Sequence, residues 1–147
     1  MAEPENNLLT VTVVTPDGIV YSHHATMLVM RSVDGELAVM HDHLPLITPL
    51  TISEVKVTRD HAMNNRVDHI AVNGGYVEFS NNVATIIADS AERARNIDAA
   101  RAQLAKERAE EHIKQAQAQH NDREMLEAEV ALRRAVNRLH VRENYSK

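Results

Sequence analysis

The chain has 147 residues, of which 44% are hydrophobic and 25% are charged, and its formal net charge is −5. It has no cysteine, which excludes disulfides and thiolate metal sites, and its negative charge argues against a nucleic-acid-binding protein. No apolar run reaches the roughly 20 residues needed to span a bilayer, so we expect no direct insertion into a membrane.

The two parts of the chain differ in composition. Residues 8–88 are rich in Val, Ile and Thr, whereas residues 89–147 consist largely of Ala, Glu, Arg, Gln and Leu, and no glycine or proline follows Gly75. β-branched residues favour strands, while the absence of helix breakers favours long helices. We therefore predict an α+β protein with a β domain at 1–88 and a helical domain at 89–147.

Short apolar runs predict the strands of the first domain. The alternation of Leu9, Val11 and Val13 with threonines predicts the first strand. Further strands are predicted at residues 19–21, 25–31, 36–40, 52–59, 66–72, 75–79 and 83–88. Strands this short and this closely spaced indicate a small antiparallel sandwich or barrel.

Turn-forming residues separate these strands. The pairs stand at Asp17-Gly18, Asp34-Gly35, Asn64-Asn65 and Asn81-Asn82. Glycine and asparagine tolerate the left-handed backbone conformation that tight hairpins require. We expect Gly74-Gly75 to form a tight turn or bulge, and Pro45 and Pro49 to mark an irregular or edge stretch.

Two capping patterns predict a helical hairpin in the second domain. Asp89 with Glu92 forms a capping box for a first helix ending near Gln117. Asn121 with Glu124 repeats the pattern, so we expect a reversal around 118–121 and a second helix from Asp122 to about Arg142.

The apolar residues of both helices are small. The predicted seam of the second helix is Met125, Ala128, Leu132, Ala135 and Leu139. The predicted face of the first is Ala94, Ile97, Leu104, Ala105, Ala109 and Ile113. Each alanine buries little area and so contributes about 1 kcal/mol or less to stability. We therefore expect a marginally stable arm that can leave its partner surface.

Arginines recur at helical spacing in this domain. Arg134, Arg138 and Arg142 are four residues apart, and Arg101 and Arg108 share a stripe with Ile97 and Leu104. Such a set either is solvated or binds a phosphate or carboxylate. His41 and His43 invite a metal hypothesis, but no cysteine or HExxH motif completes a ligand set, so we expect no metal site.

Four segments resemble the epsilon subunit of bacterial F-type ATP synthases. They are GELAVMHDHLPLITPL (35–50), VNGGYVEFSNNVATIIADSAERA (72–94), IDAARAQLAKERAEEHI (97–113) and ALRRAVNRL (131–139). The resemblance covers nearly the whole chain in the expected order. It implies an N-terminal antiparallel β-sandwich, a C-terminal antiparallel helical hairpin, and no active site of its own.

The resemblance also implies partners and a location. The subunit would belong to the central stalk at the cytoplasmic face of the bacterial membrane, peripheral to it, where it couples rotation to ATP synthesis. The sandwich would dock on the gamma subunit and the c-ring, with Glu36 and His43 at the c-ring. An extended arm would inhibit ATP hydrolysis in the alpha–beta head, where the basic residues meeting the beta subunits would be Arg133, Arg134, Arg138 and Arg142.

The family further implies a regulatory ATP site, although no cofactor is required. Ile97, Asp98, Arg101 and Ala102 match the I/L-D-x-x-R-A motif of ATP-binding members. Further contacts would come from Glu92, Arg108, Arg134 and Arg138. Glu127 stands where a nucleotide-binding relative can carry arginine, which predicts weaker binding because a carboxylate repels phosphate.

Two other classes of function stay open at this point. The first is a stand-alone nucleotide-sensing protein whose hairpin closes on ATP without a rotary partner. The second is a small metal-dependent enzyme that uses His41 and His43.

Overall fold

A computed structural model of the chain describes residues 7–146. Its strands are β1 (Leu9–Thr15), β2 (Gly18–Ala25), β3 (Met27–Ser32), β4 (Gly35–Met40), β5 (Leu46–Thr58), β6 (Val67–Ser80), β7 (Val83–Ala88) and β8 (Ala91–Arg93). Its helices are the short 3-10 turns η2 (His61–Met63) and η3 (Ala94–Asn96) and the long helices α1 (Ala99–Ala118) and α2 (Asp122–Ser146).

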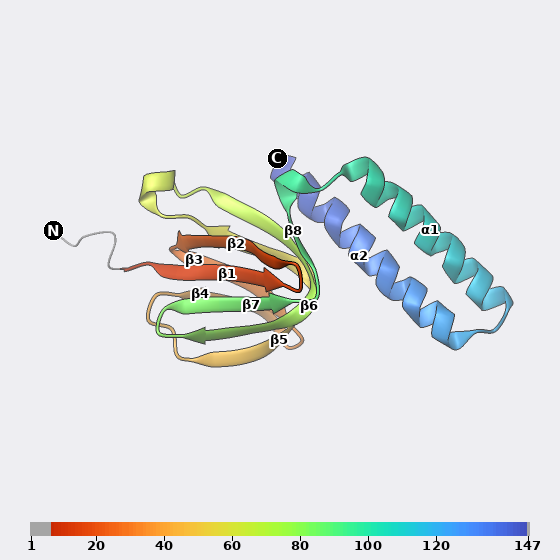
Figure 1. Cartoon of the computed structure of the whole chain (residues 1–147), viewed down its shortest axis with the longest axis horizontal. Helices are drawn as coiled ribbons and strands as arrows, with labels where there is room; N and C mark the ends of the chain where they lie inside the picture. Colours follow the sequence, from red (N-terminus) through yellow and green to blue (C-terminus); the bar gives the residue numbers. More distant parts are fainter. Residues whose placement is uncertain (1–6, 147) are drawn as a thin grey trace.

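The strands form a sandwich, and the helices form a hairpin that projects from one end of it (Figure 1). The strand order is β2-β1-β7-β6-β5-β3-β4, and β8 pairs with β6. This confirms the predicted β-sandwich followed by a helical hairpin. The sheet is not wholly antiparallel, however, because β7 returns beside β1 and runs parallel to it.

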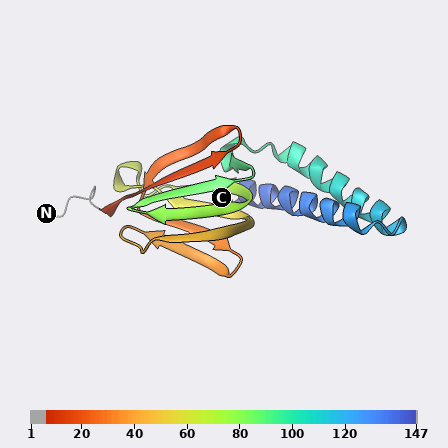
Figure 2. The same ribbon diagram turned by 60° about the horizontal axis from the view of Figure 1, so that its bottom comes forward.

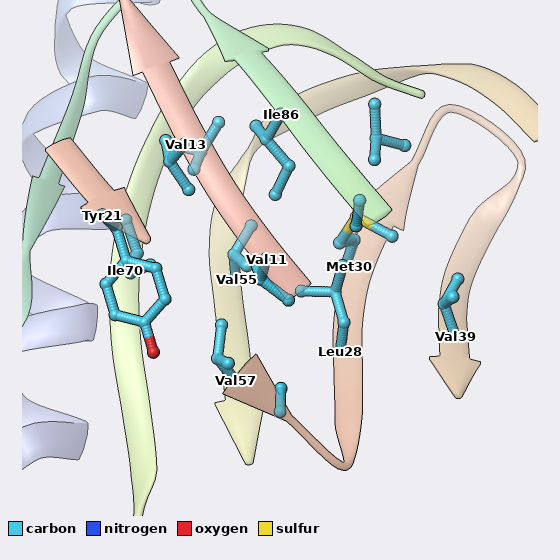
Figure 3. Close-up of a cluster of buried hydrophobic side chains, with 14 of the residues drawn as sticks. Val11, Val13, Tyr21, Leu28, Met30, Val39, Val55, Val57, Ile70 and Ile86 are labelled. Carbon is cyan, nitrogen blue, oxygen red and sulfur yellow. The ribbon is translucent and has the colours of Figure 1, made fainter. Parts of the chain in front are cut away.

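The sandwich core is almost entirely aliphatic. Alternate residues of β1, namely Leu9, Val11 and Val13, are buried, as their spacing predicts. They pack with side chains from β3, β5, β6 and β7 into one cluster, while the Tyr21 ring extends to its edge (Figure 3). A core of this kind explains how a chain with no tryptophan and a single phenylalanine folds.

The predicted turns hold their positions. Asn64, Asn65, Asn81 and Asn82 all have positive φ angles, between 52° and 62°. Pro49 lies within β5, where it pairs with Tyr76 of β6, but the pairing of β5 with β3 reaches only to Leu50. On that side Pro49 is therefore at an edge, where its missing N–H leaves no ladder bond broken.

The prediction of a tight turn or bulge at Gly74-Gly75 is wrong, because β6 runs through both residues and keeps the same register with β5 on either side of them. Glycine is required there for another reason. A Cβ atom on Gly75 would collide with the backbone carbonyl oxygen of Ile87 and lie 2.8 Å from Cα of Ala88. Gly75 therefore lets β6 and β7 approach closely at the end of their pairing.

The predicted start of the first helix is also wrong. Glu92 lies in β8 and pairs with Ala71 of β6, and the backbone N–H of Asn73 donates to Ser90. The strand forms because the edge of β6 beyond its pairing with β7 is open to residues 91–93. The sheet thus continues beyond residue 88, and the helix is capped by Asp98, whose side chain accepts from the Arg101 N–H at 3.1 Å.

The two helices pack through alanines spaced seven residues apart. In α1 the buried residues are Ala102, Ala109 and Ala116, and in α2 they include Ala128 and Ala135. The predicted α1 face is correct for Ala109 but wrong for Leu104, which is 52% exposed. Small residues allow the axes to approach closely, so the longer Leu104 is left outside the seam.

The chain reverses where predicted. Asn121 accepts a hydrogen bond from the Glu124 N–H through its side chain at 3.2 Å, and His120 has a φ of 51°. Helix α2 begins at Asp122 as expected but continues past Arg142 to Ser146.

The hairpin rests on the sandwich through α2, and Figure 2 shows its turn reaching away from the strands. The Asn137 side chain donates to the Ser53 carbonyl at 3.0 Å, and the Asn144 side chain donates to the Glu54 carboxylate at 3.0 Å. Val141 is buried with Ala71, Ala94 and Ile97. The contact is therefore a small apolar cluster flanked by a few polar bonds.

A buried ion network joins three strand segments of the sandwich. Asp68 on β6 accepts the Tyr21 hydroxyl at 2.6 Å and the Arg59 guanidinium at 3.2 Å, while Arg66 pairs with its other oxygen at 3.0 Å. Burial alone would raise the pKa of Asp68, but these hydrogen bonds and charges outweigh it, so the pKa lies below its usual value. Burial, together with the neighbouring carboxylate, raises the pKa of the Tyr21 phenol.

The substitution Asp68→Asn tests this network. At neutral pH it should lower the free energy of unfolding by about 3 kcal/mol, since the Arg59 guanidinium would lose its buried counter-charge. Because the folded-state pKa of Asp68 is depressed, its contribution is complete above the unfolded pKa, about 3.9, and is lost as the pH falls through the folded pKa.

Urea denaturation at pH 7 and near pH 3 measures both effects. The gap in stability between the two proteins should narrow at the lower pH. The exposed Asp17 provides a matched control through Asp17→Asn, which should leave stability within about 0.5 kcal/mol of the original. Equal urea midpoints for Asp68→Asn and the unmodified chain at pH 7 would contradict the network.

Candidate functional site

The candidate nucleotide site lies where the first turn of α1 meets the sandwich. Asp98 holds the start of the helix through its cap to the Arg101 N–H. Its carboxylate therefore already accepts a backbone hydrogen bond, which fixes the direction in which α1 extends from the sandwich. Arg101, in the first turn, is exposed and carries no ion pair among residues 7–146.

The two apolar members of the motif are both buried. Ile97 lies in the cluster with Ala71, Ala94 and Val141, and Ala102 is fully buried against the second helix. In this conformation neither side chain is open to an adenine ring. Ala102 instead packs between the two helices, and Ile97 packs against Ala71 of β6.

Glu92 and Arg138 meet directly. The Arg138 Nε donates to the Glu92 carboxylate at 3.2 Å, and both side chains are partly buried. Glu92 belongs to β8 of the sandwich and Arg138 to α2, so the pair ties the arm to the sheet. The structure thus brings together two residues that lie 46 positions apart in the sequence.

Arg108 and Arg134 complete the predicted set, and both are exposed. Because the hairpin reverses at residues 119–121, the first turns of α1 lie beside the last turns of α2. This places Arg101 and Arg138 near the sandwich, and Arg108 and Arg134 farther along the hairpin. Guanidinium groups distributed in this way can pair with several phosphate oxygens of an extended ligand.

Glu127, which we expect to weaken nucleotide binding, lies farther still toward the hairpin turn. Its carboxylate accepts from Arg123 at 3.3 Å, one helical turn earlier. Both side chains are largely exposed, so this pair contributes little to stability.

The remaining basic residues of α2 differ in their surroundings. Arg133 is exposed, whereas Arg142 is partly buried, donates to the Ala94 carbonyl at 3.4 Å and lies over the Tyr145 ring at 5.4 Å. Arg142 and Arg138 are thus both engaged in holding the arm to the sandwich. They would have to leave these contacts to reach another protein.

Glu36 and His43 are not brought together. Glu36 lies at the start of β4, where it pairs with Arg31 at 3.9 Å and borders the groove beside α2. His43 follows the far end of β4, where its Nδ1 donates to the Leu44 carbonyl at 2.8 Å and its ring meets Phe79 edge-on. The length of β4 separates them, so one contact surface would have to extend along that strand.

Two features of the structure were not predicted from the sequence. Exposed apolar side chains gather around His43, including Leu44 at 78% and Ile47 at 73% exposure; their composition gave a signal that could have been read. The hydrogen bonds by which Asn137 and Asn144 dock the arm left no signal in the sequence, because their partners lie 84 and 90 residues away.

His41 and His43 show no metal-ligating arrangement. The His41 Nδ1 lies 3.3 Å from the Asp42 carboxylate. Within residues 7–146, no group of three or more His, Cys, Asp or Glu side chains is placed to hold a metal ion.

Two family models cover most of the chain. The beta-sandwich domain of the ATP synthase Delta/Epsilon chain matches residues 8–94, and the long alpha-helix domain of the same chain matches residues 95–143. The ATP synthase epsilon chain of Lactobacillus gasseri is 73% identical over 147 residues, covering 100% of both chains. That of Lactobacillus helveticus is 61% identical over 141 residues, covering 96% of each.

A solved structure shares the fold. A chain in the mitochondrial ATP synthase of Euglena gracilis superposes with a TM-score of 0.71 at 18% identity, covering 86% of this chain and 76% of that one. The two family models and the Lactobacillus relatives confirm the resemblance of the four sequence segments. The chain belongs to the ATP synthase epsilon chain family.

Proposed function

We propose that this chain is a non-catalytic central-stalk subunit that transmits rotation and restrains ATP hydrolysis through its helical arm. The observation that carries the proposal is the difference in packing between the two parts of the fold. A sandwich with a continuous aliphatic core bears an arm attached by one helix and a few polar bonds. The family membership supplies the setting in which such a movable arm is useful.

The sandwich is the part suited to permanent docking. Exposed apolar side chains such as Leu44 and Ile47 lie near His43, and Tyr76 and Ile87 form an exposed cross-strand pair on β6 and β7. Exposed apolar residues of this kind favour a protein partner over solvent. We assign the first group, with His43, to the c-ring and the second to the gamma subunit, and Glu36 to the rim of the c-ring contact.

The arm is the part suited to movement. Release of α2 breaks the Glu92–Arg138 pair and the two asparagine bonds and exposes a small apolar cluster. Release also frees Arg138 and Arg142 from their contacts with the sandwich and η3. Together with Arg133 and Arg134, they would then face acidic segments of the beta subunits in the catalytic head. Ion pairing there would offset the free energy that undocking requires.

ATP would favour the folded arm. Arg101, Arg108, Arg134 and Arg138 come from both helices of the hairpin and would pair with its phosphates, with Glu92 on β8 as a further contact. Because such a ligand binds the docked hairpin and not the extended one, it shifts the equilibrium toward docking. Glu127 carries negative charge on α2 and would weaken this affinity.

The subunit would act at the cytoplasmic face of the bacterial membrane, held there by its partners. Among residues 7–146, no helix combines the length and the hydrophobicity that crossing a bilayer requires.

Removing the arm from the reconstituted ATP synthase tests inhibition. The truncated chain should end at Ile97, because β8 and Ile97 belong to the sandwich and its flanking cluster. We expect faster ATP hydrolysis than with the full chain, since the segment that enters the catalytic head is absent.

ATP-driven proton pumping provides the control for this experiment. If the truncated subunit still couples, pumping should persist alongside the faster hydrolysis. Unchanged hydrolysis with intact pumping would contradict inhibition by the arm, and a full-length chain that fails to join the complex would favour a stand-alone nucleotide sensor.

The substitution Arg101→Gln tests the nucleotide site. Isothermal titration of the full chain with ATP should give a dissociation constant about tenfold higher for the variant, because one charge-assisted hydrogen bond to phosphate is lost. Arg133→Gln removes the same charge from an exposed position outside the predicted site and should leave the affinity unchanged. Equal affinities for all three proteins, or no ATP heat up to about 10 mM, would rule out binding at this site.

A further inference from the structure

A cavity lies between the sandwich and the C-terminal end of α2. It has a volume of about 300 Å³ and is bordered by Arg66, Asp68, Arg93, Arg95, Asn144 and Tyr145. Its size is at the lower end of the range for ligand sites, roughly 300 to 1,000 Å³. The first four residues come from the sandwich and η3, and the last two from the arm, so the cavity exists only while the arm is docked.

Positive charge is in excess at this cavity. Among residues 7–146, three guanidinium groups border it, against the single carboxylate of Asp68. The oxygens of Asp68 already accept from Tyr21, Arg59 and Arg66. The carboxylate thus has little capacity left to neutralise the other two arginines.

Arg93 and Arg95 lack a counter-ion of their own. Neither guanidinium lies within 4.0 Å of a carboxylate belonging to residues 7–146 or donates a hydrogen bond to one of their atoms. Arg93 lies over the Tyr21 ring at 5.1 Å from its centroid, which holds its side chain at the cavity wall. Arg95 is exposed and free to turn toward a ligand.

Arg93 also acts on a histidine near the cavity. His23 lies edge-on to the Tyr21 ring at 4.7 Å. Its pKa is lowered by burial and then by the positive charges of Arg59 and Arg93.

We propose that this cavity binds a small phosphate oxyanion, inorganic phosphate or pyrophosphate, between Arg66, Arg93 and Arg95. Guanidinium groups converging from three positions suit a tetrahedral anion with several acceptor oxygens. The Asn144 side chain and the Tyr145 ring close the site from the arm. None of the arginines of the hairpin nucleotide site borders this cavity.

The site would couple anion binding to docking of the arm. A ligand that needs both walls binds only the docked state and therefore stabilises it more as the ligand concentration rises above the dissociation constant. The inference goes beyond the proposed function, because it gives the folded arm a second ligand that is independent of ATP at the hairpin.

Amide NMR of the full chain at constant ionic strength tests the proposal, with separate titrations of phosphate, pyrophosphate and ATP. We expect saturable shifts at residues 66–69, 93–95 and 144–145 with phosphate or pyrophosphate, complete by about 10 mM. Arg95→Gln should weaken this binding about tenfold by removing one charged donor. Arg133→Gln, which makes the same charge change away from the cavity, should not alter it.

Three outcomes would overturn the proposal. One is the absence of saturable shifts with either small anion. Another is equal weakening by Arg95→Gln and Arg133→Gln, which would mean that only overall charge matters. The third is a set of shifts confined to residues 97–108, which would place the anions at the hairpin nucleotide site instead.

Discussion

The docking of α2 on the sandwich is the contact on which the behaviour of this protein depends. It includes the Asn137 bond to Ser53, the Asn144 bond to Glu54, the Arg142 bond to the Ala94 carbonyl, the Glu92–Arg138 pair and a four-residue apolar cluster around Val141. A net hydrogen bond contributes about 1 kcal/mol, and a partly exposed ion pair no more. The contact is therefore strong enough to place the arm and weak enough for another surface to compete for it.

The packing inside the arm also allows the hairpin to leave the sandwich. Ala102, Ala109 and Ala116 let the two helices approach closely but bury little area. Helices of this kind keep their shape through α-helical propensity rather than through a large core, so the hairpin can leave the sandwich without a core of its own to expose. The sandwich differs because its aliphatic cluster is continuous and Asp68 links its strands through buried charged bonds.

Local signals were enough to predict most elements. The asparagine pairs at 64–65 and 81–82 need positive φ, and β1 needs alternation, so neighbouring residues alone determined them. The first helix was misplaced because β8 depends on the edge of β6, a partner some 20 residues away. The residues proposed for the nucleotide site, such as Asp98 and Arg101, come from a contiguous motif, whereas the arginines around Asp68 are assembled by the fold and gave no local pattern.

Hydrogen exchange of the full chain measures the difference in strength between the two parts directly. If α2 holds the arm by these few bonds, amides of α1 and α2 should open without the sandwich and exchange about a hundredfold faster than the core amides of β1 and β6. Asn137→Ala should increase the gap further by releasing the Ser53 contact. Exchange of helix and core amides at one common rate would mean that arm and sandwich open as a single unit, which contradicts a movable arm.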